Sequence, residues 1–247
     1  MVYSPLTVTE PGEPESFAYP SLTQDLKLVW DGLDGDIIGP IHASAASVHL
    51  YDNNRSQFRK IASVEDVRID CYVTESRFAM ICEKYDKGGG WIGGGAALVL
   101  NAGSKILAAN RRRGKALTGH LRYAWLRQIL FQRKEGFLGI EALRLVYKSE
   151  SANMFLQLTL DKSTDSAALA HELMERTVAY RKADTDPFEA DEAEAFERLL
   201  GAGRVVQEKG TMGKYELPTS WPAGSAAQYA PPAPPSKITK KNPGFND

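Results

Sequence analysis

The chain has little cysteine, no excess of either charge and no long apolar run. Its 247 residues include only two cysteines, Cys71 and Cys82, without a CxxC pair or a Cys/His cluster at zinc spacing. Neither a disulfide framework nor a structural zinc site is indicated, so a reducing, cytoplasmic setting is the default expectation. The 30 Lys and Arg nearly balance the 31 Asp and Glu. No global electric field therefore favours nucleic acid as a partner.

Membrane-crossing and secretion signals are also weak. The longest uncharged stretch, residues 88–104, is diluted by glycines and ends at Lys105. A transmembrane helix needs about 20 predominantly apolar residues, so we expect none here, although this stretch could lie on a membrane surface. Residues 1–16 carry prolines and acidic residues instead of the basic start and apolar run of a signal peptide.

The chain contains enough apolar residues to form one substantial hydrophobic core. The 43% apolar content is ordinary for a folded protein of this length, whereas both ends are rich in proline or small residues that bury little surface. We expect four parts: a disordered N-terminus (1–20), a folded domain (21–182) with an insertion (87–117), a helix with a small hairpin (183–217), and a disordered Pro-rich tail (218–247).

The clearest local pattern predicts a hairpin over residues 67–84. Apolar and polar residues alternate on the outgoing strand, and the pattern returns at Phe78, Met80 and Cys82. With a two-residue turn, Val73 faces Phe78 and Cys71 faces Met80, so that one face of the hairpin collects the apolar residues. Strand-like segments follow at 121–131, 143–147 and 154–160.

The period then changes from that of strands to that of helices. An apolar stripe that includes Leu173, Met174 and Val178 predicts a helix over 163–182, with Ser163 or Thr164 as its N-cap. Asp186, Pro187 and Glu189 predict the start of a second helix that ends at Gly201. Its apolar face would be Phe188, Phe196, Leu199 and Leu200. Residues 204–207 and 214–217 suggest a small hairpin.

Antiparallel strands followed by one helix resemble the pleckstrin-homology-like superfold, and its bacterial GRAM-like versions in particular. The resemblance rests on the hairpin at 72–81, with Thr74 before the turn and Arg77 after it, and on the strand pair and helix at 143–182. It covers about residues 26–182 and implies an α+β fold, an antiparallel barrel or strongly bent sheet capped by the helix. It also implies a binding role toward lipid headgroups, peptides or other proteins.

Motifs for catalysis or cofactor binding are incomplete. Gly88, Gly90 and Gly93 satisfy the spacing of a dinucleotide-binding loop, but Arg111, Arg112 and Arg113 occupy the region where an acidic ribose ligand belongs. The sequence has no HExxH motif, no GxSxG elbow and no P-loop. We therefore expect neither a cofactor nor an enzymatic activity.

The strongest local charge feature lies at the end of the insertion. Arg111, Arg112, Arg113 and Lys115 are continued by His120 and Arg122, and Trp91 precedes them. Guanidinium groups suit phosphate oxygens, and a helix from Trp91 to Lys115 with an aromatic anchor and a cationic end would suit a membrane interface. The alternative interpretation is a solvated helix end whose charges complement the helix dipole.

The sequence therefore predicts a non-catalytic binding module. Its ligand would be an anionic lipid or another phosphate-bearing group, met by the basic insertion, and its location would be cytoplasmic, with peripheral attachment at the inner face of the membrane. A protein-interaction adaptor is the alternative function, and an enzyme of unrecognised type is the third.

Overall fold

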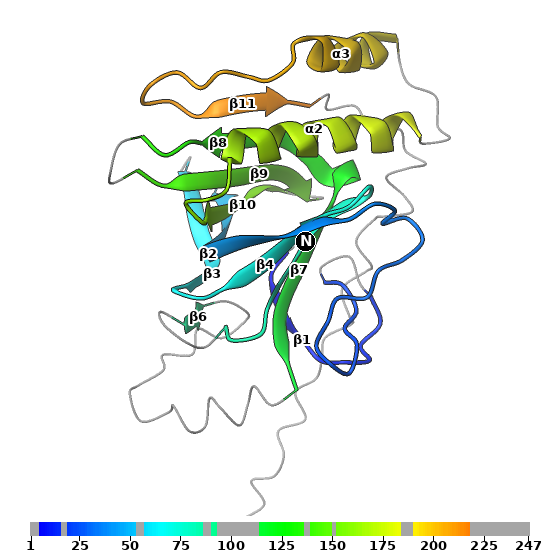
Figure 1. Cartoon of the computed structure of the whole chain (residues 1–247), viewed down its shortest axis with the longest axis vertical. Coiled ribbons are helices and arrows are strands. Elements are labelled where there is room, and N and C mark those ends of the chain that lie inside the picture. Colours follow the sequence, from blue (N-terminus) through cyan, green and yellow to red (C-terminus); the bar gives the residue numbers. More distant parts are fainter. Residues whose placement is uncertain are drawn as a thin grey trace, which may run out of the picture.

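The computed structural model describes residues 5–15, 19–52, 57–85, 90–92, 114–135, 139–149, 152–183 and 190–217. These residues form a large antiparallel sheet with two α-helices (Figure 1). The expected α+β class is confirmed. In the described part of the chain, no helix is long and apolar enough to cross a membrane.

The elements follow one another with strands dominating the first two thirds. The strands are β1 (Thr7–Thr9), β2 (Ile38–Asp52), β3 (Gln57–Glu65), β4 (Ile69–Val73), β5 (Arg77–Cys82), β6 (Gly90–Ile92), β7 (Ala116–Arg122), β8 (Leu126–Gln132), β9 (Glu141–Ser149), β10 (Ala152–Leu160) and β11 (Gly213–Glu216). The helices are the short 3-10 turn η2 (Tyr123–Trp125), α2 (Ser166–Lys182) and α3 (Ala190–Gly201).

The strand order is β1-β7-β5-β4-β2-β10-β9-β8-β11, and every pairing is antiparallel. The 15-residue strand β2 organises this path. One of its edges pairs with β10, while its other edge pairs first with β4 and then with β3, which in turn pairs with β6. Within the described residues the path ends at β1 and β11, and no pairing between these two strands closes a barrel.

The predicted hairpin has the expected register. Val73 pairs with Phe78 and Cys71 with Met80. The turn is fixed by Thr74, whose Oγ1 accepts hydrogen bonds from the backbone N–H groups of Ser76 and Arg77, as Ser/Thr turns commonly do. The expectation that only one face is apolar was incomplete, because every residue of β5 is buried. Both faces of this strand are therefore covered.

The helix α2 covers the core side of the sheet. Leu173 and Met174 have no exposed surface, and the same core contains residues of β2, β4, β8, β9 and β10. The helix begins three residues later than predicted. Its N-cap is Asp165, whose side chain accepts hydrogen bonds from the backbone N–H groups of Ala167 and Ala168, and a carboxylate there also complements the helix dipole.

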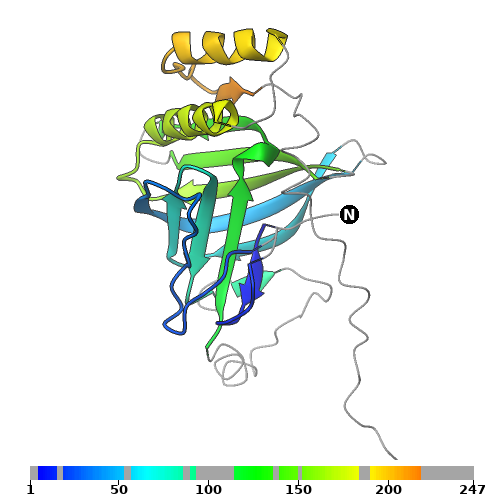
Figure 2. The same cartoon turned by 90° about the vertical axis from the view of Figure 1, so that its right-hand side faces the viewer.

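The N-terminal part is packed, contrary to the expected disorder of residues 1–20. β1 pairs with β7, and Leu6 and Thr9 are buried. Beyond it, Leu22 and Leu28 form a second hydrophobic cluster with the outward residues of β5, Ala79 and Ile81. We call the described residues 5–15 and 19–34 the strap, because they lie along the outer side of the sheet beside β7 (Figure 2). The strap is what buries the second face of β5.

Three further expectations concern the segments after the hairpin. Trp91 belongs to strand β6 and not to a helix starting there, and residues 93–113 lie outside the described residues. The prediction of a small hairpin between residues 204–207 and 214–217 was wrong, because β11 pairs with β8. α3 ends at Gly201 as predicted, with Phe196 buried, whereas Asp186, Pro187, Phe188 and Glu189 and the tail 218–247 lie outside the described residues.

Candidate functional site

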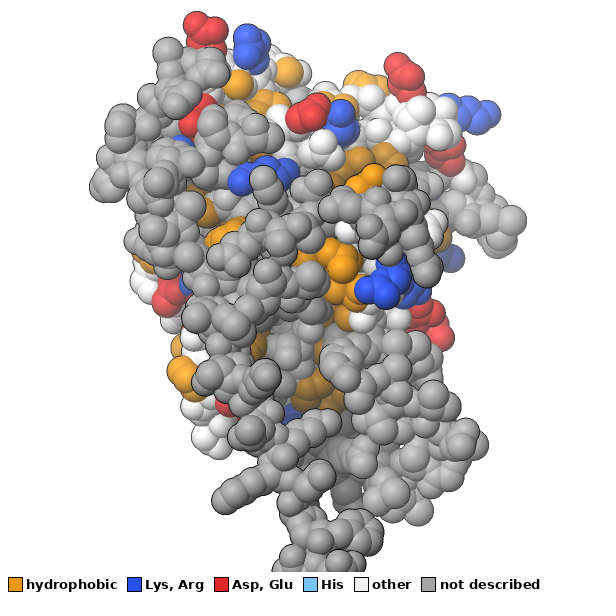
Figure 3. All heavy atoms as spheres, turned by 180° about the vertical axis from the view of Figure 1, so that it is seen from behind, with side chains coloured by type: hydrophobic (Ala, Val, Ile, Leu, Met, Phe, Trp, Pro, Cys, Tyr) orange, Lys and Arg blue, Asp and Glu red, His pale blue; other side chains and the backbone are white. Residues whose placement is uncertain are grey.

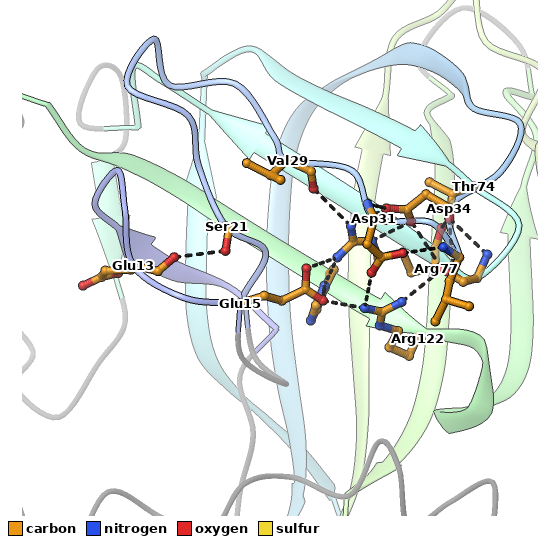
Figure 4. A network of polar contacts seen from close by, with 12 residues as sticks. Glu13, Glu15, Ser21, Val29, Asp31, Asp34, Thr74, Arg77 and Arg122 are labelled. Atoms are coloured by element: carbon orange, nitrogen blue, oxygen red, sulfur yellow. Dashed lines mark hydrogen bonds and ion pairs between the residues drawn. The ribbon is translucent and has the colours of Figure 1, made fainter.

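A buried ion network joins the strap to the sheet. Arg77 and Asp34 are 0% and 1% exposed, and they share two hydrogen bonds, Nε to Oδ1 at 2.8 Å and Nη2 to Oδ2 at 2.5 Å (Figure 4). Burial by itself raises the pKa of Asp34, but the bonds from Arg77 and the backbone bond from Asp31 outweigh it, so the net pKa is lowered. The carboxylate is therefore held in its ionised form.

The network continues to Arg122 through two more carboxylates of the strap. Glu15 bridges the two arginines, accepting a bond from Arg77 Nη1 at 2.9 Å and a short one from Arg122 Nη2. Asp31 accepts a bond from Arg122 Nη2 at 3.1 Å. His120 faces the same group, with its Nδ1 3.0 Å from Arg77 Nη1. Since a guanidinium can only donate, Nδ1 accepts, and the imidazole is the Nε2–H tautomer.

The structure thus places two of the sequence-predicted ligand residues in a different role. His120 and Arg122 are 2% and 7% exposed and are engaged with Arg77 and with the strap. They do not continue an exposed basic patch. The sequence contained no local signal for this, because Glu15 and Arg122 are 107 positions apart.

Of the other predicted ligand residues, the structure describes Lys115 and Trp91. Lys115 precedes β7 and forms an ion pair with Glu10 of the strap. Trp91 lies in β6, where its backbone pairs with Val64. Arg111, Arg112 and Arg113 lie outside the described residues, so the basic insertion stays a prediction.

A second polar and aromatic group lies on the face of the sheet that points away from the main core. Phe155 of β10 stacks on His49 of β2, with ring centroids 4.3 Å apart and an interplanar angle of 14°. The guanidinium carbon of Arg144, from β9, lies 4.4 Å from the centre of the same ring. Because β10 runs between β2 and β9, His49 and Arg144 approach Phe155 from opposite sides.

Two more aromatic side chains extend this group toward the end of the β2–β3 pair. Phe58 meets Phe155 edge to face at 4.8 Å, and Tyr51 meets Phe58 at 5.1 Å. Phe155 is only 5% exposed, whereas Phe58 is 43% exposed. We call His49, Tyr51, Phe58, Arg144 and Phe155 the Phe155 cluster. Seen from behind, hydrophobic side chains lie beside Lys and Arg side chains on the molecule's surface (Figure 3).

Arg144 is the cation of the Phe155 cluster, and its partners are neutral. Arg144 Nη2 donates to the neutral amide oxygen of Gln157 at 2.9 Å, its buried Nε has no hydrogen-bond partner, and none of the ion pairs found among the described residues includes Arg144. Burial alone lowers the pKa of this guanidinium. The pKa of His49 is lowered by burial first, and then by the charges of Lys60 and Arg144. Burial and the two positive charges therefore both disfavour the protonated form of His49.

One histidine gains a carboxylate partner that the sequence did not reveal. His42 Nδ1 lies 2.9 Å from Asp70 Oδ1 across the β2–β4 pair, at the rim of a surface hollow of about 300 Å³ that Arg68 and Asp70 line. Arg68 Nη2 donates to His42 Nε2 at 3.1 Å. Both ring nitrogens are thus engaged, so the imidazole has no free nitrogen for acid–base chemistry in this arrangement.

Metal binding and thiol chemistry depend on the histidines, cysteines and carboxylates in the described part of the chain. No group of three or more His, Cys, Asp or Glu side chains there could hold a metal ion. Cys71 and Cys82 are buried and not bonded to each other, and burial raises the pKa of Cys71 far above its ordinary value. A thiol in that state is a poor nucleophile.

Comparison of the chain with protein-family models and with curated proteins finds no match.

Proposed function

We propose that this protein is a non-catalytic binding module that recognises an anionic membrane surface through the Phe155 cluster. The single observation that supports the proposal is Arg144, a half-buried guanidinium with no carboxylate partner among the described residues, stacked on Phe155. Leaving a charge partly desolvated and unpaired costs stability. A charged group kept in this condition is a candidate for pairing with a ligand.

The chemistry around Arg144 suits an interface that is both anionic and apolar. The planar guanidinium can pair with phosphate oxygens. Lys60 lies one strand beyond His49 in the same row of the sheet, in an exposed ion pair with Glu65. Phe58 presents exposed apolar surface at the other end of the cluster. Cationic and aromatic side chains that lie together are typical of surfaces that bind at the headgroup level of a bilayer.

Co-sedimentation with vesicles tests this proposal. The full chain should bind phosphatidylcholine vesicles that contain phosphatidylserine, bind pure phosphatidylcholine vesicles less, and lose affinity as salt rises. Arg144→Gln should lower the partition coefficient roughly fivefold, since each cation near an anionic surface contributes about 1 kcal/mol. Arg198→Gln, the same change at an exposed position of α3, should bind as the wild type does.

Two further experiments separate the apolar contribution from the electrostatic one, and a free anion from a membrane surface. Phe58→Ser should weaken binding without changing its salt dependence, because it removes apolar contact and not charge. A titration with inorganic phosphate distinguishes a free anion from a membrane surface. Saturable phosphate binding that is lost in Arg144→Gln, without vesicle binding, would replace the membrane by a small anionic ligand. If Arg144→Gln binds vesicles as tightly as the wild type, the Phe155 cluster is not the site.

The basic insertion predicted from the sequence can be tested in the same assay. Replacing Arg111, Arg112 and Arg113 by Gln should reduce vesicle binding if those residues meet the same surface. The adaptor function stays the alternative. It would be favoured if vesicle binding is absent and a binding partner is retained at high salt, since apolar protein interfaces depend little on ionic strength.

A further inference from the structure

The strap is held to the sheet in the way that a bound peptide is held. It contributes the short edge strand β1, a few apolar side chains, the backbone oxygens of Val29 and Asp34, which accept bonds from Arg77 and from the backbone of Glu75, and a group of carboxylates. Among the described residues, three carboxylates contact the buried arginines: Glu15, Asp31 and Asp34. Each of them belongs to the strap, whereas both arginines belong to the sheet, Arg77 to β5 and Arg122 to β7. The charge is therefore divided cleanly between the two parts.

The apolar contacts are divided in the same manner. Leu22 and Leu28 of the strap lie against Ala79, Ile81 and Ala116 of the sheet. Trp30 packs edge to face on Tyr72, with centroids 5.2 Å apart, and its ring lies 5.8 Å from the guanidinium carbon of Arg77. The outer face of β4, β5 and β7 therefore combines two arginines with a small apolar surface. The acidic residues, the leucines and the tryptophan of the strap complement this face in charge and in apolar surface.

The anchors of the strap differ in exposure, and Leu6, Thr9 and Asp34 are the buried ones that lie nearest its two ends. Asp34 is buried, but the side chains of Glu15 and Asp31 are 28% and 38% exposed although they contact the same arginines. β1 pairs with β7 over only three residues. At its C-terminal end the strap leads into Gly35, which has a φ of +53°, and then into Asp36, which is bonded to Arg176 of α2. Replacement of the strap therefore has to break the contacts of the buried Leu6 and Thr9 as well as the ion pairs of Glu15 and Asp31, while the anchor at Asp34 can hold.

We infer that the outer face of β4, β5 and β7 is a docking site for acidic peptide segments that carry leucine or tryptophan, and that the strap occupies this site as an intramolecular ligand. A segment of the same chemistry can replace the strap in trans. The charge complementarity of Glu15 and Asp31 with Arg77 and Arg122 defines the partner, and the strap itself shows how such a segment sits. This site is separate from the Phe155 cluster, so either proposal can fail without the other.

A peptide added in trans has to compete with the tethered strap for the docking site, and this competition determines its apparent affinity. A short tether gives the strap an effective concentration on the order of mM, so a free peptide competes poorly with it. The probe is a fluorescein-labelled synthetic peptide with the sequence of residues 5–34, titrated against the full chain and followed by anisotropy. In the double variant Glu15→Gln/Asp31→Asn the tethered strap is weakened while the labelled peptide keeps both carboxylates. The double variant should bind the peptide about tenfold more tightly than the wild type does.

The controls decide whether the gain arises at this face. Adding Arg122→Gln to the double variant should remove the gain, because the carboxylates of the peptide lose their partner, whereas adding Arg198→Gln on α3 should leave it intact. Near-ultraviolet circular dichroism shows whether each variant is folded. A folded double variant that binds the peptide no better than the wild type, or one whose gain survives Arg122→Gln, overturns the inference.

A measurement on the wild type covers the case in which the variants do not fold. Hydrogen exchange should show the backbone amides of the strap opening at a lower free energy than those of β2 and β10, since a displaceable segment opens without global unfolding. If the strap amides exchange only together with those of the core strands, the strap is a fixed part of the fold and the docking site does not exist.

Discussion

Removal of the Asp34 carboxylate is the most direct perturbation of the buried ion network. Asp34→Ala leaves the Arg77 guanidinium buried with its main partner gone, because Asp34 supplies two of its bonds at 2.8 and 2.5 Å and both side chains are at most 1% exposed. Breaking a buried pair from one side typically costs about 3–5 kcal/mol. Glu15 remains next to Arg77, on its other terminal nitrogen, so we expect the lower part of this range.

Equilibrium unfolding in urea measures the loss. For a domain of this size, a loss of about 3–4 kcal/mol should also lower the midpoint of thermal unfolding by roughly 6–16 °C. The matched control is Glu197→Ala, which removes the partner of Lys182 from an exposed pair with side chains 69% and 38% exposed. Exposed pairs contribute about 0–1 kcal/mol, so this control should be nearly silent. If Asp34→Ala costs no more than Glu197→Ala, the network does not hold the strap and our account of the N-terminal region is wrong.

The other predictions concern pH, the cysteines and the helix. The pKa of Asp34 is lowered from 3.8, so its ionised form stabilises the fold above that pH, and this contribution is lost as pH falls through the lower folded-state value. Urea titrations at several acidic pH values should therefore show a smaller loss of stability below about pH 4 in Asp34→Asn than in the wild type, and equal slopes would contradict the pKa shift. Cys71 and Cys82 should react with a thiol reagent only after urea unfolding, because both are buried, and fast labelling of the native protein would show that the hairpin opens. Leu173→Ala should cost about 2–5 kcal/mol in urea unfolding, since Leu173 lies on the fully buried face of α2, whereas Leu33→Ala at a 53% exposed position should cost little. Similar losses would mean that α2 does not cap the core.

Local pattern was sufficient where neighbouring residues decide the structure. Alternation around Val73 and Phe78 determined the register of the hairpin, and the stripe that contains Leu173 determined the buried face of α2. In both cases the apolar residues that pack together are close in the sequence, so periodicity of 2 or 3.6 residues identifies them.

The strap and the Phe155 cluster were missed for one physical reason. The part of the strap before residue 21 has a composition typical of a disordered segment, and the strap is joined to the sheet by ion pairs with arginines 43 to 107 positions away. The Phe155 cluster collects His49, Arg144 and Phe155 from three strands that become neighbours only when β10 enters between β2 and β9. A single sequence carries no local signal for contacts of this range. His120 and Arg122 were selected for their charge, but they lie against Glu15, which belongs to the segment that was expected to be disordered.

The proposed function depends most directly on Arg144. The measurement is the partition coefficient of the full chain on phosphatidylserine-containing vesicles at low salt, compared among the wild type, Arg144→Gln and Arg198→Gln. Our account predicts that Arg144→Gln binds roughly fivefold more weakly than the wild type while Arg198→Gln binds equally well. Equal binding by all three proteins, or equal weakening in both variants, would contradict recognition of an anionic surface by the Phe155 cluster.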